Sequence, residues 1–379
     1  MKNALRLFVM AALTAAFALT AFAQAPAPAA SPAATGPCTE ADAQAALYQK
    51  FLKEYKGTPE QQKLAYESGK EYLTKYGNCP EDSVKQVAAF VQKWVSKYEA
   101  ATVEFNCTKA ANESPAQAFE ACKAWIAANP DNLRPHLALV AAGIKAYANK
   151  DNSLNARAEA EARTALQLIE SGKTTDVWAP FASQADAPAG LRYYIAAWTF
   201  ETNPDEAANQ LRTVAQSNSA FAKEPATYQL LGAAYYNGEY KKLAAEYKEK
   251  YEGKEETPES AALFNRINAV LARIVDAYAR AVALSAGKPQ QAQLRNTLAT
   301  FYKQRNDGKE DGLNELVANV LSKPLMLPGQ EPAPPAPAPP STTGTNGTAT
   351  PATTPAGTTT TPASTTPKPA PTPQKPPRN

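Results

Sequence analysis

The chain has 379 residues, of which 44% are hydrophobic and 20% are charged, and its formal net charge is +3. This length is sufficient for a large hydrophobic core. Lysine and glutamate are interspersed along the chain, and no basic stripe stands out. Nucleic-acid binding depends on clustered positive charge, so we do not expect it here.

The first 23 residues are organised like a signal peptide. Lys2 and Arg6 precede an apolar stretch at 7–19, and Ala21-Phe22-Ala23 supplies the small-x-small pattern that a signal peptidase recognises. The alternative is an uncleaved membrane anchor, but this stretch is shorter than the roughly 20 residues that span a bilayer. We therefore expect residues 1–23 to be cleaved, leaving an exported protein, periplasmic or secreted, with no stable membrane span.

Composition separates the rest of the chain into three parts. Residues 24–37 are rich in Ala and Pro and are expected to form a linker. Residues 327–379 contain mainly Pro, Thr, Ala and Gly, and such a tail cannot bury enough apolar surface to become ordered. Residues 38–326 remain as the folded domain.

The four cysteines all lie in the first part of this domain, at Cys38, Cys79, Cys107 and Cys122. An even number of cysteines in an exported protein favours disulfides. Cys38 precedes the first predicted helix and Cys79 follows the second, so a bond between them would close the open end of an antiparallel hairpin. Cys107 is then left to pair with Cys122. A zinc site is the alternative, but it lacks CxxC spacing and a nearby histidine.

Apolar residues at helical spacing run through nearly the whole domain, and no strand is expected. Pro and small polar residues mark the helix starts, as in Thr58-Pro59-Glu60. The predicted helices cover residues 41–55, 59–76, 80–98, 115–129, 133–147, 153–169, 257–286, 289–302 and 312–321, besides the repeated pattern described below. The first four form two hairpins within 38–130, and an irregular insert at 172–189 interrupts the hairpins of 131–326.

Three of these helices have informative faces. The helix at 59–76 is expected to direct Leu64, Ala65, Tyr72 and Leu73 inward. An alanine ladder marks the close-packed side of the helix at 153–169, and the helix at 257–286 has two adjacent apolar seams, which predicts contacts on two sides. The ladder is Ala158, Ala162 and Ala165, and the seams are Leu263, Ile267, Val270, Ile274 and Leu271, Val275, Tyr278, Val282.

One helical pattern occurs twice. Leu191-x2-Tyr194-Ile195-x2-Trp198-x8-Ala207-x3-Leu211-x2-Val214 returns as Tyr228-x2-Leu231-Gly232-x2-Tyr235-x8-Ala244-x3-Lys248-x2-Tyr251. Large residues three and four apart share one face of a helix, and a small residue beside them allows a second helix to approach closely.

This pattern resembles the tetratricopeptide repeat family, best at Tyr228, Leu231, Gly232, Tyr235 and Ala244. Lys248 and Tyr251 depart from the family pattern, and Ile195 replaces its small residue. The two copies start 37 residues apart, at Leu191 and Tyr228, whereas the usual repeat has about 34 residues. The resemblance implies an all-α, right-handed superhelical solenoid of antiparallel hairpins, whose first helices line a concave groove for a peptide or protein partner.

The repeat alignment also points to polar residues that would face this groove. Asn and Gln can hydrogen-bond an extended backbone, and Tyr adds an amphipathic anchor. The alternative is an ordinary solvated helix face. The residues concerned are Gln229, Tyr236, Asn237, Gln293, Asn296 and Lys303.

Catalytic patterns are scarce in the sequence. His136 is the single histidine and lies in an apolar helix, so a packed side chain is expected there. The acid pairs Glu255-Glu256 and Glu310-Asp311 lie in turn-like contexts typical of solvated loops. Trp178, in the irregular insert, is a candidate surface anchor. We expect no cofactor and no metal site.

Taken together, these patterns favour a non-catalytic protein-binding scaffold or adaptor of the bacterial cell envelope. A cell-envelope structural protein, whose Pro/Thr-rich tail contacts peptidoglycan, is the alternative. A hydrolase would require a pocket with two facing acids.

Overall fold

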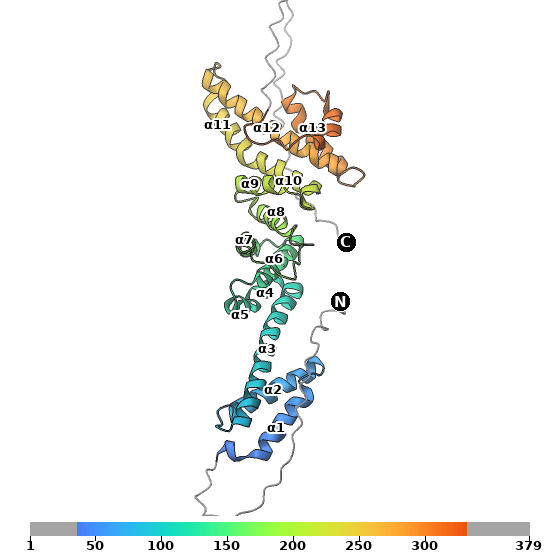
Figure 1. The fold of residues 1–379 in the computed structure, drawn as a ribbon. Helices are drawn as coiled ribbons and strands as arrows, with labels where there is room; N and C mark the ends of the chain where they lie inside the picture. The colour runs from blue at the N-terminus through green and yellow to red at the C-terminus, as the bar shows by residue number, and fades with distance from the viewer. Residues whose placement is uncertain (1–35, 332–379) are drawn as a thin grey trace, which may run out of the picture. The chain divides into compact units, whose positions relative to one another are not determined.

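The computed structural model describes residues 36–331, and within that range all regular secondary structure is helical, with no β-strand (Figure 1). The predicted signal peptide, nearly all of the linker and the tail from residue 332 onward lie outside the described residues. The chain forms two compact units, one ending at Tyr98 and one starting at Glu99. No helix in the range 36–331 is both long enough and apolar enough to cross a membrane.

The first unit is built on a hairpin of α1 (Ala41–Glu54) and α2 (Pro59–Tyr76). Thr58 begins α2 as the sequence predicts: its side chain accepts a hydrogen bond from the Gln61 backbone N–H, and the Gln61 side chain accepts one from the Thr58 backbone N–H. This reciprocal cap satisfies two N–H groups that a helix start leaves unpaired. The core of the unit joins α1 and α2 to the start of α3 (Asp82–Glu113).

The inward face of α2 differs from the prediction. Leu64 is 47% exposed, whereas Ala65 is fully buried. The buried face of α2 also includes Gly69, where an added Cβ would lie 2.9 Å from Val95 on α3. Helix α3 approaches α2 along this line of small residues. The buried face of α2 therefore runs through Ala65 and Gly69, and Leu64 lies outside it.

Both predicted disulfides are present. Cys38 lies in η1 (Pro37–Thr39), just before α1, and is bonded to Cys79, just after α2, with 5.5 Å between their Cα atoms. This bond closes the open end of the first hairpin. Cys107 near the end of α3 is bonded to Cys122, and both side chains are fully buried.

Helix α3 is longer than the helix predicted to start at residue 80. It continues past Tyr98 to Glu113, because the intervening stretch contains neither Pro nor Gly and consists largely of good helix formers. The helix predicted at 115–129 is instead divided at Cys122 into α4 (Pro115–Ala121) and α5 (Lys123–Ala128).

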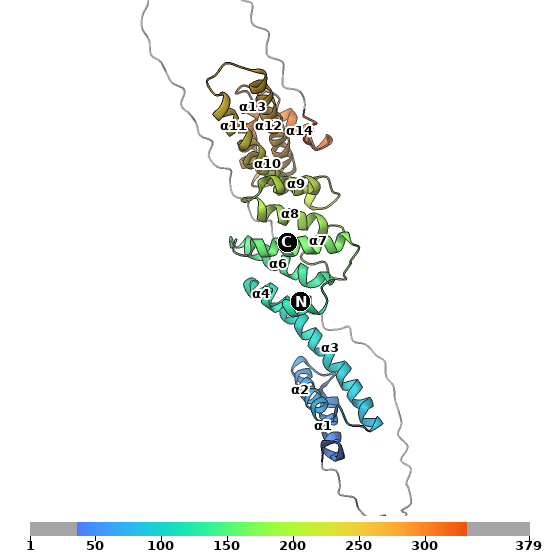
Figure 2. The ribbon, with the colours of Figure 1, turned by 90° about the vertical axis from the view of Figure 1, so that its left-hand side faces the viewer.

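In the second unit, helices that are adjacent in the chain pack in pairs (Figures 1 and 2). Its further elements are α6 (Leu133–Ala148), α7 (Asn155–Glu170), α8 (Ala187–Thr199), α9 (Pro204–Ala215), η2 (Phe221–Lys223), α10 (Pro225–Tyr235), η3 (Tyr236–Tyr240), α11 (Lys241–Tyr251), α12 (Pro258–Leu284), α13 (Gln291–Arg305), α14 (Leu313–Asn319) and η4 (Val320–Ser322). From α6 to α10 each helix packs against the next, and α12 then packs against α10 and α13.

The repeated pattern lies on α8 to α11, and most of its large apolar residues are buried as the helical spacing predicts, whereas Tyr194 and Tyr251 are partly buried and Lys248 is exposed. Leu191, Leu211 and Leu231 are fully buried, and Tyr235 is 3% exposed. The second copy has an unexpected connection: α10 passes into α11 through the π-helical turn η3. Gly238 lies in this turn, and a side chain there would displace the Asp205 carboxylate, because an added Cβ would overlap Asp205 Oδ1.

Small residues set the distances between α6, α7 and α8. Ala158, Ala162 and Ala165 on α7 are all fully buried, as the alanine ladder predicts. Gly143 on α6 faces Ala158 so closely that an added Cβ would overlap the Ala158 Cβ and lie 3.1 Å from Trp198 on α8. Any larger side chain at this crossing would force the helices apart.

Ala158→Leu should therefore lower the free energy of unfolding by about 1–3 kcal/mol, the usual cost of adding bulk to a packed core. Ala160→Leu is the matched control, because Ala160 lies on the exposed face of the same helix; its effect should stay within about 0.5 kcal/mol. Urea unfolding followed by far-ultraviolet circular dichroism measures both. Equal effects of the two substitutions would contradict the packing described for α7.

Candidate peptide-binding surface

Helix α12 contains three buried charged residues in an otherwise apolar stretch. Arg273, Asp276 and Arg280 are 4%, 7% and 5% exposed. Their spacing places them along one face of the helix, opposite the two adjacent apolar seams, whose residues are all buried. We call them the α12 charge row. Charges this deeply buried are costly unless they are paired, so their partners determine what the row can do.

Asp276 and Arg280 pair with each other and with the backbone of a distant segment. The Arg280 Nε donates to Asp276 Oδ2 at 2.9 Å, and its Nη2 donates to the carbonyl oxygens of Lys323 and Pro324 at 3.0 and 2.6 Å. The backbone N–H of Met326 donates to Asp276 Oδ2 at 3.2 Å. These bonds to residues 323–326 use main-chain atoms only, so they hold an extended chain largely independently of its side chains.

Arg273 lies between two carboxylates. Its Nη2 donates to Glu239 Oε2 at 2.9 Å, and its Nε lies 2.7 Å from Glu331 Oε1. The guanidinium also lies over the Tyr235 ring, 5.0 Å from the centroid. Three buried atoms here, Tyr235 Oη and the Nε and Nη1 of Arg273, have no hydrogen-bond partner within residues 36–331, so the Arg273 Nε contact with Glu331 is an ion pair without hydrogen-bond geometry. The site can therefore form further hydrogen bonds next to the Glu331 carboxylate, which it already binds.

Residues 323–331, which we call the C-terminal strap, cross the charge row as an extended segment followed by a turn. Lys323 has extended backbone angles, and Leu325 packs against the core of the second unit. The turn closes with a hydrogen bond from the Gln330 N–H to the Leu327 carbonyl, and Gly329 supplies the left-handed angle, with φ of +81°. This turn brings Glu331 back to Arg273.

A shallow polar cavity of about 330 Å³ adjoins Tyr235 and Glu239. Its walls come from α9, the end of α10, the η3 turn, α11 and α12. Much of its charge is already paired: Lys242 contacts Asp205, and Glu239 contacts Arg273. The lining residues are Asp205, Ala208, Asn209, Arg212, Tyr235, Glu239, Lys242, Leu243 and Arg266.

The first three predicted groove residues lie on α10 and η3 and are partly buried. The Tyr236 ring packs against Phe301 of α13, with 5.3 Å between ring centroids. The Asn237 side chain donates to the Ala233 carbonyl and accepts from Lys241 Nζ. Gln229 is on α10. In this structure Tyr236 and Asn237 are therefore engaged in contacts within the chain.

The other three predicted groove residues lie on α13 and are exposed. Lys303 pairs with Glu310, at 2.6 Å, whereas Gln293 and Asn296 present their side chains near the start of the helix. Helix α12 packs against both α10 and α13, so the two predicted groups flank the helix that carries the charge row.

Sequence reasoning missed the charge row itself. A usable signal was present: within the apolar stretch 267–284, Arg273, Asp276 and Arg280 are the only charged residues. In a helix with two buried seams, such charges must find partners. The sequence does not indicate which distant segment supplies them.

His136 is buried, as predicted. It is 4% exposed, and its Nδ1 lies 2.6 Å from Glu161 Oε2, which joins α6 to α7. The candidate acid pairs lie in exposed loops: Glu255 and Glu256 precede α12, and Glu310 pairs with Lys303.

Trp178, the candidate surface anchor, is partly buried against the core that includes α6 to α8. The three remaining tryptophans lie on amphipathic helices, as predicted, and pack against core residues.

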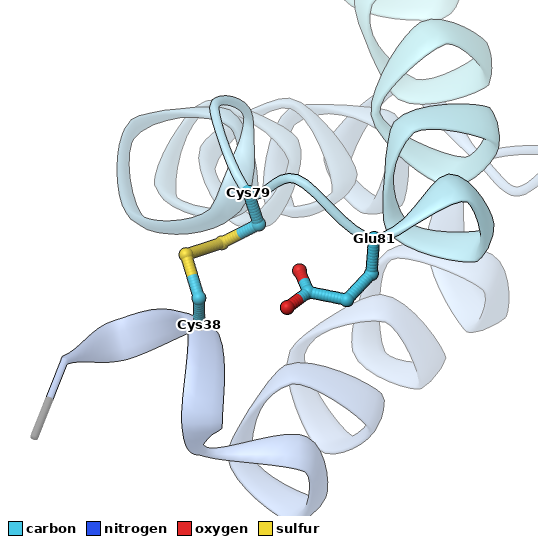
Figure 3. A group of neighbouring side chains, drawn as sticks. All are labelled: Cys38, Cys79 and Glu81. Carbon is cyan, nitrogen blue, oxygen red and sulfur yellow. A yellow bond between two sulfur atoms is a disulfide. The ribbon is translucent and has the colours of Figure 1, made fainter. Parts of the chain in front are cut away.

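A possible ligand cluster of Cys38, Cys79 and Glu81 lies at the first disulfide (Figure 3). Zinc binds cysteine as the thiolate. Because the two sulfur atoms are bonded to each other, only the Glu81 carboxylate remains as a strong ligand, and the oxidised cluster is a structural staple.

Comparisons of this chain with protein-family models, with curated proteins and with solved structures found no match. The resemblance to tetratricopeptide repeats therefore depends on the residues quoted above and on the helix pairs they form.

Arg280→Met should destabilise the protein by about 3–5 kcal/mol, because it leaves Asp276 buried without its partner. The double variant Asp276→Leu/Arg280→Met should recover part of this loss, since it removes both charges. Lys250→Met is the matched control: Lys250 and Glu246 have the same spacing on α11 but are exposed, so its effect should be much smaller. Equal losses for Arg280→Met and Lys250→Met in urea unfolding would argue against a buried, paired charge row.

Proposed function

We propose that this protein is a non-catalytic scaffold or adaptor of the bacterial cell envelope that binds an extended peptide or protein segment. One observation carries the proposal: the α12 charge row holds the backbone of residues 323–326 through two carbonyl oxygens and one N–H group. Recognition of main-chain atoms by side chains fixed on a rigid helix is an effective way to hold an extended chain.

The same proposal includes a solenoid of tetratricopeptide-like repeats in the second unit. The consecutive pairing of α6 with α7 and of α8 with α9 supports it. So does the burial of Tyr228, Leu231 and Tyr235 at the positions that the repeat requires. A right-handed stack would place the first helix of each pair on a common concave side.

Export to an oxidising compartment is the third part of the proposal. Two disulfides within one chain are typical of periplasmic and secreted proteins. The organisation of residues 1–23 as a signal peptide agrees with this, because a signal peptide directs the chain to export.

Photo-crosslinking in intact cells tests the scaffold proposal. A photoreactive residue at Gln293 or Asn296, both exposed on α13, should yield the same discrete adduct with one envelope protein. Ala156 and Ala160 on the exposed face of α7 are the matched control positions. Absence of an adduct from α13, or the same adduct from α7, would argue against partner binding at this surface.

The alternative is a structural protein whose Pro/Thr-rich tail contacts peptidoglycan. Removal of residues 332–379 leaves the strap in place and separates the two functions. Under the scaffold proposal the shortened protein keeps its crosslinked partner. Under the alternative it loses retention on insoluble cell wall while the crosslinks at Gln293 and Asn296 do not form.

A further inference from the structure

The strap has the features of a bound ligand that happens to belong to the same chain. It contacts the α12 charge row through two carbonyl oxygens, one N–H group and one carboxylate. All four are groups that any acidic peptide offers. In turn, the Arg280 guanidinium donates to the two carbonyls, the Asp276 carboxylate accepts from the N–H group, and the Arg273 guanidinium pairs with the strap carboxylate.

The strap is held by few interactions. Lys323, Pro324, Pro328, Gly329 and Gln330 are exposed, and its remaining residues are only partly buried. A segment with little buried apolar surface opens locally at low free-energy cost. When the strap is released, the part of the charge row that it covers becomes exposed to water, which solvates charged groups well.

The contacts define the chemistry of a competing segment. It must be extended where its carbonyls meet Arg280, and it needs an N–H group two residues after the second carbonyl, at the position of Met326. Proline is excluded there, because proline has no backbone N–H. A carboxylate further along must reach Arg273, whose Nε lies 2.7 Å from Glu331 in the strap.

We propose that the α12 charge row is a binding site for an extended acidic peptide segment, and that residues 323–331 occupy this site in the free protein until a partner segment displaces them. This proposal rests on the scaffold function proposed above and assigns both its ligand chemistry and its regulation. The strap lowers the apparent affinity for the partner, because only the open fraction of molecules can bind.

The test uses the full-length protein and a fluorescent peptide with the sequence of residues 321–332. Met326→Pro removes the N–H group that meets Asp276, and Glu331→Gln removes the carboxylate that meets Arg273; neither alters α12. Each should lower the Kd of the peptide by about tenfold relative to the unsubstituted protein, on the scale of one hydrogen bond to a charged group. Gln330→Ala is the matched control within the strap and should leave Kd unchanged.

Two further measurements show where the peptide binds. Addition of peptide to the unsubstituted protein should accelerate hydrogen exchange at the Met326 amide. Arg280→Lys in the Met326→Pro background should weaken binding, because one ammonium cannot reproduce the fork of donors that meets Asp276 and the two carbonyls. Arg280→Lys keeps the charge, so the protein should remain folded, which circular dichroism checks.

An equal Kd for the unsubstituted protein and both strap variants would overturn the proposal, as would failure of the peptide to bind the variants. Neither result would alter the crosslinks formed from Gln293 and Asn296. The strap proposal can thus fail while the scaffold function stands. Loss of those crosslinks, in contrast, would count against the scaffold function itself.

Discussion

The structure of the second unit depends on close approach of helices where a glycine or alanine on one helix faces a larger group from another segment. Gly143 faces Ala158 and Trp198, Gly190 faces Phe181, and at Gly232 an added Cβ would lie 2.7 Å from the Tyr278 ring. Tightly packed interiors have no spare volume, so each of these contacts fixes an interhelix distance. Repeated from α6 to α12, they determine which helices pack side by side.

This packing also explains the position of the charge row. Helix α12 packs against α10 and also contacts α11, α13 and α14. The two adjacent seams take up one side of the helix, and the polar residues Arg273, Asp276 and Arg280 lie on the opposite side. Because their surroundings are dry, their hydrogen bonds are strong, and a missing partner is costly. An extended segment such as the strap can satisfy these groups without disturbing the helix pairs.

Much of the helical architecture could be predicted from the sequence because its signals are local. Thr58-Pro59 begins α2, the two seams of α12 are both buried, and the disulfide partners follow from the antiparallel course of α1 and α2. The exposure of Leu64 was not predictable in this way. It depends on where α3 settles against Gly69, and that contact is not encoded within α2.

The candidate site was predicted less well, for the same physical reason. Gln293 and Asn296 remain predicted partner contacts on an exposed face, whereas Tyr236 packs against Phe301, which is distant in sequence. The strap begins at a Pro-containing segment that composition assigns in part to the tail. Its order comes from Arg280 and Asp276, far earlier in the chain. The composition of a segment indicates how much apolar surface that segment can bury by itself. It does not indicate whether residues far away in the sequence will bind the segment.

A double-mutant cycle at Gly232 and Tyr278 tests most directly whether small-against-large contacts hold this unit together. Gly232→Ala should destabilise the protein by about 1–3 kcal/mol, because the new methyl group meets the Tyr278 ring. In a Tyr278→Leu background, the same substitution should be neutral or stabilising, since alanine favours helix over glycine by about 1 kcal/mol. An identical effect of Gly232→Ala in both backgrounds would contradict the account.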